Sequence, residues 1–320
     1  MPEVAGGDGG PTLTTVVAHR LRVDAHRDDP GIARLLAAIH ERHGGHVAAV
    51  LLYGSYLRGK RDTLLDFYVL LDDLRGALPR RWHEAANRLL PPNVYHLSLP
   101  GQPGAPPLRA KYATMTVAAF ETGMRRFHSY FWSRFTQPCG LVYARDADTR
   151  AAVTRSLGAA VDTFVQRVAP MLDPPFASPA LWRRGFALTY ACELRAEDGD
   201  GVARLYRHDA DHFDALLRAY AGEPGAAVRH TGTGYAGTRH PSGRGRARWG
   251  WRVRQIQGKL LSVARLVKAA GTFDDPLDYL LWKIARHSGI QVTPTDRQRR
   301  HPLIFAWPLL WRLYRRGAFR

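Results

Sequence analysis

The sequence predicts an α/β (α+β) domain with a mixed sheet, followed by a mainly helical domain and a basic amphipathic C-terminal segment. Three observations predict this arrangement. An apolar run with strand character, Val47–Tyr53, ends at a Gly-Ser turn and is followed by a second apolar run over 64–71. Residues 150–221 instead repeat apolar side chains at helical spacing. From Trp249 onwards, apolar and basic residues recur on opposite faces of a helix.

The composition of the 320-residue chain is that of a folded and strongly basic protein. A hydrophobic content of 45% supports a substantial core, and the length allows two or three structural units. The net charge of +18 predicts an anionic partner, which can be a nucleic acid, an anionic lipid surface or a polyphosphate substrate. Cys139 and Cys192 have neither a disulfide framework nor a zinc-site spacing, which is typical of a reducing cytoplasm.

The sequence contains no pattern that predicts export or a membrane span. Residues 1–12 are polar and glycine-rich and lack the basic-then-apolar order of a signal peptide, so we expect a flexible tail there. No apolar run reaches the ~18 residues that a spanning helix requires. We therefore expect a cytoplasmic protein that is soluble or peripheral on the inner face of the cell membrane.

Helices and strands alternate through the first 150 residues. A short helix is expected within 13–29, and a better-defined one over Pro30–His43, because proline suits a first turn and Gly44 ends the apolar periodicity. This helix leads directly into the strand Val47–Tyr53. The elements expected after the second strand are a helix over 79–90, strands over 94–99 and from 111, a helix over 117–135 and a strand over 140–144.

The next part of the chain predicts helices over 150–172, 179–195 and 208–221. The letters GTGYAG at 232–237 match a dinucleotide-binding loop, but they follow no strand and run into PSGRGRAR. We therefore interpret 231–248 as a flexible Gly/Arg-rich linker. His208 and His212 share a helix face at metal-ligand spacing, but they stand among charged residues without a third ligand, which favours a solvated surface.

The junction between the first two strands carries the residues most suited to chemistry. Gly54 and Ser55 form a turn after the first strand, and Asp66 stands on the second strand among leucines and aromatics. Glycine lets the backbone approach a triphosphate closely, and turn N–H groups with a serine hydroxyl can bind its anionic oxygens. A strand carboxylate offers a hard oxygen ligand to Mg²⁺. This spacing is typical of a nucleotidyltransferase site.

A structural interpretation of the same residues is also open. Gly-Ser is common turn chemistry, whereas an ionised carboxylate on a buried strand is costly unless it is paired or metal-bound, so the combination favours function. Nucleotidyltransferases usually carry a second acid two residues after the first, where this chain has Tyr68. Asp72 shares the face of Asp66 but lies about 20 Å along an extended strand, too far to hold the same ion.

Several short motifs in one order resemble the mitochondrial translocator-maintenance family of phosphatidate cytidylyltransferases. They are Tyr53-Gly54-Ser55, Leu65-Asp66-Phe67, Asp72-Asp73, Trp82-His83 with Asn87, Asn93 with His96-x-Ser98, and Lys111-Tyr112. The likeness continues more weakly through 188–195 and covers about 45–300. The chain departs from the family pattern at Tyr56 and Ala113, where the family has glycine, and at Leu97, where it has tyrosine. The family also lacks the nearby second acid, so Tyr68 does not argue against activity.

The resemblance implies that CTP and phosphatidic acid react to CDP-diacylglycerol and pyrophosphate with Mg²⁺. It assigns Gly54 and Ser55 to the CTP phosphates, Asp66 to Mg²⁺ and Lys111 to phosphate charge, so that Asp66, Lys111 and Ser55 are the candidate catalytic residues. The other nucleotide-binding candidates are Tyr53, Arg58, His83, Asn87, Asn93 and His96. A phosphomonoester is largely ionised at neutral pH, so alignment and charge neutralisation suffice without a strong base.

The segment 249–320 predicts association with an anionic membrane surface. Its first helix has two opposite rows, an apolar one (Ile256, Leu260, Val263, Val267) and a basic one (Arg254, Arg265, Lys268). The pattern recurs at 276–289, and 302–316 is rich in tryptophan and arginine but is broken by Pro308 and too short to span a bilayer. Such a composition is typical of a lipid headgroup interface, although helices of this type also pack on protein cores.

The sequence leaves two other functions open. The same core could transfer a nucleotide to a soluble or polynucleotide acceptor, or it could be a catalytically degenerate module that binds membranes or RNA. The tryptophans of 302–316 alternate with aliphatic residues instead of lining a polar stripe, so no stable nucleic-acid partner is expected. The domains expected are a nucleotidyltransferase domain over 1–150, a helical domain over 151–248 and a membrane-surface region over 249–320.

Overall fold

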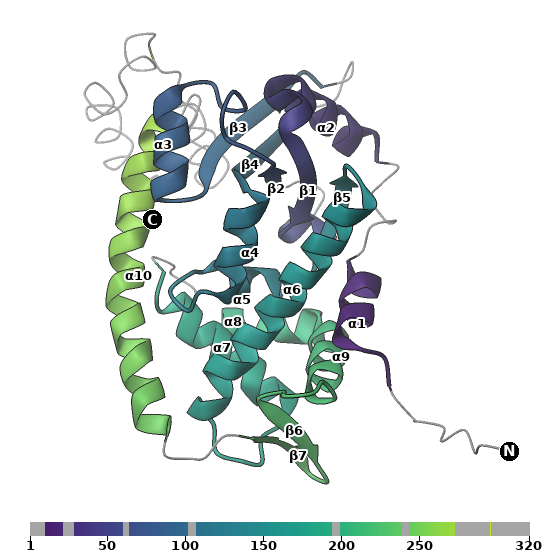
Figure 1. The fold of residues 1–320 in the computed structure, drawn as a ribbon, viewed down its shortest axis with the longest axis vertical. Coiled ribbons are helices and arrows are strands. Elements are labelled where there is room, and N and C mark those ends of the chain that lie inside the picture. The colour runs from purple at the N-terminus through teal and green to yellow at the C-terminus, as the bar shows by residue number, and fades with distance from the viewer. Residues whose placement is uncertain are drawn as a thin grey trace, which may run out of the picture.

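The computed structural model describes residues 10–21, 29–59, 64–101, 107–193, 199–238, 243–272 and Thr295. Its centre is a five-stranded sheet in the order β3-β4-β2-β1-β5 (Figure 1). The strands are β1 (Val47–Tyr53), β2 (Leu65–Leu71), β3 (Asn93–Leu99), β4 (Leu108–Thr116) and β5 (Cys139–Ala144). The β2–β4 pair is parallel and the other pairs are antiparallel. The predicted α/β class with a mixed sheet is therefore confirmed.

One face of the sheet packs against α2 (Pro30–His43) and α3 (Arg81–Leu89). The α2 boundaries agree with the prediction because both ends are specified locally. The Asp29 carboxylate accepts hydrogen bonds from the N–H groups of Gly31 and Ile32 at 2.8 and 3.2 Å, and Gly44 ends the helix with a φ of 61°. The apolar side of α2 then buries Ile32, Leu35 and Ile39 against the strands.

The other face of the sheet packs against α4 (Val117–Arg125), α5 (Phe131–Phe135) and α6 (Ala147–Val168). The single helix predicted over 117–135 is wrong, because the chain turns back between α4 and α5. Gly123 permits this turn, since a Cβ there would lie 2.5 Å from the Phe131 ring. The aromatic face of the short α5 is thereby brought directly under the sheet.

The remaining helices extend the same core beyond the sheet. They are α1 (Leu13–Arg20), α7 (Ser178–Tyr190), α8 (Gly199–His208) and α9 (Ala210–Ala221), of which α8 was not predicted. Buried residues of β1, β2, α6, α7 and α9 belong to one continuous cluster. The predicted boundary between residues 150 and 151 falls near the start of α6, which packs on the sheet and on the following helices.

The first part of the segment 231–248, which we interpreted as a linker, belongs to a β-hairpin. Its strands are β6 (Val228–Thr231) and β7 (Gly234–Gly237). Tyr235 exchanges backbone hydrogen bonds of 2.8 and 2.9 Å with Phe176. A Cβ at Gly234 would lie 2.7 Å from the Phe176 carbonyl oxygen, so the strand needs glycine for this close approach. The linker prediction was wrong for 231–237, which belong to this hairpin, and for 244–248, which begin the helix α10 (Arg244–Thr272).

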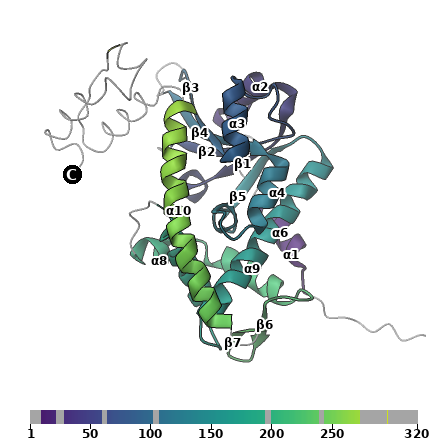
Figure 2. The same ribbon diagram turned by 60° about the vertical axis from the view of Figure 1, so that its left-hand side comes forward.

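The long helix α10 (Arg244–Thr272) runs from the β6–β7 hairpin to α3 and β3 (Figures 1 and 2). Its basic row faces the protein. Arg254 is 3% exposed and donates a hydrogen bond of 2.8 Å to the Ser129 carbonyl, while Lys268 donates to the Pro92 carbonyl and the Asn93 side chain at 2.6 and 3.0 Å. A Cβ at Gly258 would lie 2.4 Å from the Cys192 carbonyl oxygen, so glycine allows this close packing.

The apolar row of α10 faces outwards. The sequence left open whether this row packs on a protein core, and among the described residues it does not. Ile256 and Leu260 are 67% exposed and Val263 is 50% exposed. The basic row faces inwards because its side chains find partners there. They donate to backbone carbonyls, and the Arg254 guanidinium also lies over the rings of Phe127, Trp132 and Trp251. The predicted segments 276–289 and 302–316 lie outside the described residues. Of the helices that the structure describes, none is both long and apolar enough to cross a bilayer.

Buried His43 predicts a pH-dependent stability. Its imidazole donates to the Ala77 carbonyl at 2.7 Å, and burial lowers its pKa from 6.5 to about 4. Between these pH values the unfolded chain binds a proton that the folded chain does not, so the free energy of unfolding rises with pH by roughly 3 kcal/mol. The loss of stability that buried His43 causes is therefore complete below pH 4 and absent above pH 6.5. We expect chemical denaturation to show this rise.

The variant His43→Gln provides the control, because it removes the titrating group and keeps an amide that can donate to Ala77. The rise between pH 4 and 6.5 should be smaller in the variant by the contribution of His43. An unchanged pH dependence would assign the effect to other groups.

Candidate active site

The sheet register brings Tyr53, Asp66, Lys111 and His96 into one row. Tyr53 is paired with Asp66, Asp66 with Lys111, and Lys111 with His96. Directly paired residues of neighbouring strands project to the same face of a sheet. This is the face on which α4, α5 and α6 pack. Candidates from four separate motifs of the sequence are therefore neighbours.

Gly54 fits closely against the Asp66 carboxylate. Its backbone has a φ of 92° and a ψ of −153°, a conformation nearly restricted to glycine. A Cβ at this position would lie 3.0 Å from Oδ2 of Asp66. The 3₁₀ turn Ser55–Arg58 begins directly after Gly54. The turn predicted to bind phosphate thus stands beside the carboxylate predicted to bind Mg²⁺, while no contact described here joins Arg58 to either Asp66 or Lys111.

Asp66 and Lys111 form a partly exposed ion pair. The Lys111 ammonium lies 3.1 Å from Oδ1 of Asp66, and their side chains are 34% and 21% exposed respectively. Oδ1 is itself buried and has no hydrogen bond of good geometry among the described residues, so the contact with Lys111 is electrostatic. An ion pair of this exposure contributes at most ~1 kcal/mol to stability. Asp66 and Lys111 can therefore each exchange this contact for another ligand with little loss of stability.

The surroundings of Asp66 fit a magnesium ion held by one protein carboxylate. The described residues contain no group of three His, Cys, Asp or Glu side chains that could hold a metal ion. Mg²⁺ keeps several waters and is commonly held by one or two carboxylates together with substrate phosphates. The buried Oδ1 and the glycine backbone next to Oδ2 are consistent with such a site.

The two tyrosines that depart from expected patterns do not fill the phosphate turn. Tyr56 is buried on the α2 side of the sheet, and its hydroxyl donates to the Asp29 carboxylate. Tyr68 lies on the face of Asp66, one step further along β2, with its hydroxyl 3.1 Å from that of Tyr130. Burial and the neighbouring Tyr130 raise the pKa of Tyr68 well above its usual value, so it stays neutral.

His83, Asn87 and Asn93 are not brought to Asp66. Asn87 donates to the Thr114 carbonyl at 2.8 Å, Asn93 donates to the His83 carbonyl at 2.9 Å, and Nδ1 of His83 lies 3.1 Å from the Tyr95 hydroxyl. These contacts fasten α3 to the opposite face of the sheet. Asn93 and His96 are three residues apart on one strand, and an odd separation places them on opposite faces. Of this motif, only His96 shares the face of Asp66.

Sequence reasoning missed the basic and aromatic side chains that α5 and α10 contribute. The guanidinium of Arg134 lies 5.3 Å from the ring centroid of Tyr53, and that of Arg265 lies 4.7 Å from the ring of Tyr130. Burial raises the pKa of Tyr53, and the charges of Lys111 and Arg134 oppose this rise. Positive charge thus converges on Tyr53, the neighbour of Asp66. No motif predicted this, because the residues come from distant helices.

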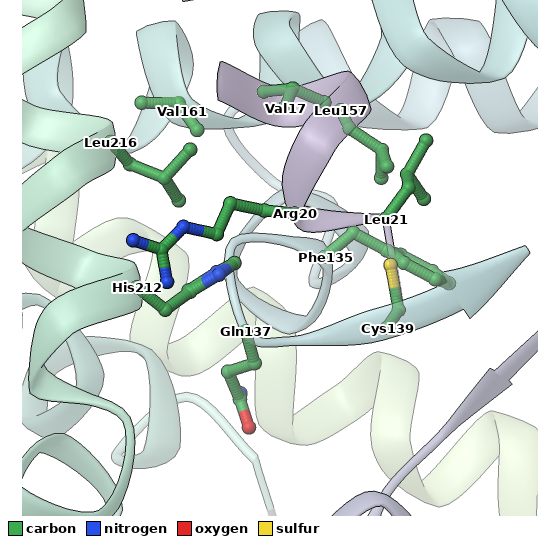
Figure 3. A pocket seen from close by; sticks show the side chains of 10 residues that line it. All are labelled: Val17, Arg20, Leu21, Phe135, Gln137, Cys139, Leu157, Val161, His212 and Leu216. Atoms are coloured by element: carbon green, nitrogen blue, oxygen red, sulfur yellow. The ribbon is translucent and has the colours of Figure 1, made fainter. Parts of the chain in front are cut away.

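Two cavities lined by described residues lie away from Asp66. One of about 710 Å³ lies where α10 begins, between Leu172, Phe176 and Trp251. A much smaller one, of about 20 Å³, lies between α1, α6 and α9, where Arg20 extends towards His212 (Figure 3). It has room for about one water molecule.

His212 is buried, with Nε2 3.0 Å from the Thr136 carbonyl, so the predicted solvated position is wrong for this histidine.

Comparison of the chain with models of known protein families and with curated proteins finds no match. The candidate site therefore rests on the motif residues and on the geometry that brings them together.

Proposed function

We propose that the protein is a Mg²⁺-dependent phosphatidate cytidylyltransferase, which converts CTP and phosphatidic acid to CDP-diacylglycerol and pyrophosphate. One observation carries the proposal: a strained glycine turn, a strand carboxylate and a lysine that are separate in sequence meet on one sheet face. We infer the two substrates from the motif resemblance, and we infer the class of reaction from the grouping of Gly54, Asp66 and Lys111. The net charge of +18 suits two anionic substrates and an anionic lipid surface.

In this proposal each residue has a distinct role. Asp66 holds the Mg²⁺, which supplies charge neutralisation for the triphosphate and the departing pyrophosphate. The Gly54-Ser55 turn orients the phosphates, and Lys111 exchanges its contact with Asp66 for one with phosphate oxygens. An anionic oxygen of phosphatidic acid forms a bond to the α-phosphorus of CTP as the bond to the β-phosphate oxygen breaks. The attacking phosphate is already ionised, so no side chain has to remove a proton.

The test is direct transfer of labelled nucleotide. The protein is incubated with CTP labelled in the cytosine, vesicles containing phosphatidic acid, and Mg²⁺. We expect label in the lipid phase, release of pyrophosphate and no product after chelation of Mg²⁺. Label that appears on added RNA instead would favour a polynucleotide acceptor. Nucleotide or vesicle binding without turnover would favour a degenerate binding module.

The exposed apolar row of α10 supports the lipid acceptor. Trp249, Ile256 and Leu260 are each at least 66% exposed, and Val253 and Val263 are 46% and 50% exposed. Such a contiguous apolar surface marks an interaction site. Because the acceptor proposed here resides in a bilayer and the protein is strongly basic, we assign this row to the surface of an anionic membrane.

A charge placed in the apolar row should weaken binding to vesicles. We expect Leu260→Asp to reduce flotation with phosphatidic acid vesicles by about tenfold. The substitution removes an apolar side chain that the bilayer would bury, and it adds a negative charge that anionic lipid repels. Gln257→Asp is the matched control, since it adds the same charge on the same exposed helix outside the apolar row. Equal flotation of the two variants would contradict a role of this row.

A further inference from the structure

Two partly buried arginines converge on the tyrosines beside Asp66. The guanidinium of Arg134 in α5 lies 5.3 Å from the Tyr53 ring and 5.6 Å from the Tyr130 ring. The guanidinium of Arg265 in α10 lies 4.7 Å from the same Tyr130 ring. Tyr130 is in turn 3.1 Å from the Tyr68 hydroxyl. Two like charges from different helices therefore meet at one aromatic ring.

One donor of each arginine, its Nε–H group, is not satisfied within the described part of the chain. Nε of Arg134 and Nε of Arg265 are both buried and have no hydrogen-bond partner there. Neither guanidinium forms an ion pair among the described residues, although the charge of Glu193 acts on Arg134. A buried donor without a partner costs free energy, and an anion that accepts from it removes this cost. The arrangement thus favours a negatively charged ligand.

The tyrosines connect this cluster to the nucleotide site. Tyr53 is paired with Asp66 in the sheet, and the charges of Lys111 and Arg134 both act on its hydroxyl. Lys111 and Arg134 thus lie around one side chain. A triphosphate held by the Gly54-Ser55 turn and Lys111 leaves the arginines available for the second substrate.

We propose that Arg134 and Arg265 bind the phosphomonoester of the acceptor. This inference rests on the proposed function and assigns the two substrates to separate groups of residues. Guanidinium groups donate several hydrogen bonds in a plane, which suits the three oxygens of a doubly charged phosphate. Because Arg265 belongs to α10, the helix with the exposed apolar row also completes the acceptor site. Docking on a bilayer and recognition of the lipid headgroup would then depend on one element.

The experiment separates acceptor binding from nucleotide binding. Dihexanoyl phosphatidic acid, below its micelle concentration, and CTP with Mg²⁺ are each titrated calorimetrically into the full-length protein. We expect Arg134→Gln and Arg265→Gln to weaken phosphatidic acid binding at least about tenfold and to leave CTP binding unchanged. Arg265→Lys should retain part of the affinity, since it keeps the charge but loses the planar donors. Arg252→Gln, which removes an exposed arginine of α10, should bind as the wild type does.

Several outcomes would overturn the inference. Wild-type affinity in both glutamine variants would remove the arginines from the site, and equal loss of CTP and lipid binding would assign them to the nucleotide or to the fold. If Arg134→Gln fails to fold, Arg265→Gln decides the question. Equal affinity for inorganic phosphate would assign the cluster to free phosphate instead of a lipid headgroup. Arginine-dependent lipid binding by a protein that binds no CTP would support this site and refute the proposed function.

Discussion

Asp66→Asn is expected to lower the rate of nucleotide transfer at least about 10³-fold while the protein stays folded. The amide removes the negative charge that would hold Mg²⁺ but keeps the size of the side chain. The ion pair with Lys111 is lost, but the pair is partly exposed and contributes little to stability. The measurement is the initial rate with labelled CTP and phosphatidic acid vesicles, together with a thermal unfolding curve for each protein.

Asp72→Asn is the matched control for this variant. Asp72 follows β2, and it binds Arg145 at 2.8 Å and His46 at 3.1 Å, at the opposite end of the strand from Asp66. It should retain nearly the wild-type rate. If both variants lose activity to the same degree, Asp66 has no special role, and an unaffected rate in Asp66→Asn would end the assignment of the metal site.

Gly54→Ala is expected to reduce the transfer rate by about 10²-fold or more and to destabilise the fold by about 1–3 kcal/mol. The added Cβ would meet Oδ2 of Asp66 at 3.0 Å, and the backbone of residue 54 has a φ of 92° that alanine rarely adopts. The carboxylate or the turn must then move, which separates the groups that bind metal and phosphate. Activity and denaturant unfolding measured on the same preparation separate the two effects.

Gly59→Ala distinguishes backbone strain from the contact with Asp66. Gly59 also has a positive φ, 82°, but a Cβ there meets no atom within 4 Å. We expect a loss of stability of about 1 kcal/mol and an activity close to that of the wild type. A Gly59→Ala enzyme as inactive as Gly54→Ala would show that flexibility of the whole turn, and not close approach to the carboxylate, limits the rate.

The features that the sequence predicted well are specified by neighbouring residues. Asp29 and Gly44 define the ends of α2, and the apolar run Val47–Tyr53 before a glycine defines β1, so local signals sufficed there. The adjacency of Gly54 and Asp66 also follows from two strands joined by a short connection. Lys111 was a candidate from its motif, but its contact with Asp66 depends on the parallel pairing of β2 with β4.

The predictions that failed concern contacts between distant parts of the chain. The reversal between α4 and α5 depends on Phe131 packing against Gly123, and the position of the β6–β7 hairpin depends on its backbone hydrogen bonds with Phe176. A helical pattern shows that α10 has two unlike faces, but it does not show which one meets the protein. Arg134 and Arg265 gave no motif signal for the same reason, since each belongs to a helix whose placement is set by packing.

The sequence by itself determined the strands β1 and β2, the glycine turn between them, the carboxylate on β2 and the presence of two opposite rows in α10. These follow from backbone preferences and short-range periodicity, which act between near neighbours. Only the tertiary structure decided that Lys111 pairs with Asp66, that His83, Asn87 and Asn93 lie on the other face of the sheet, and that the basic row of α10 points inwards. Strand order, register and helix docking settle such questions, because they are set by the shape and polarity of surfaces assembled from the whole chain.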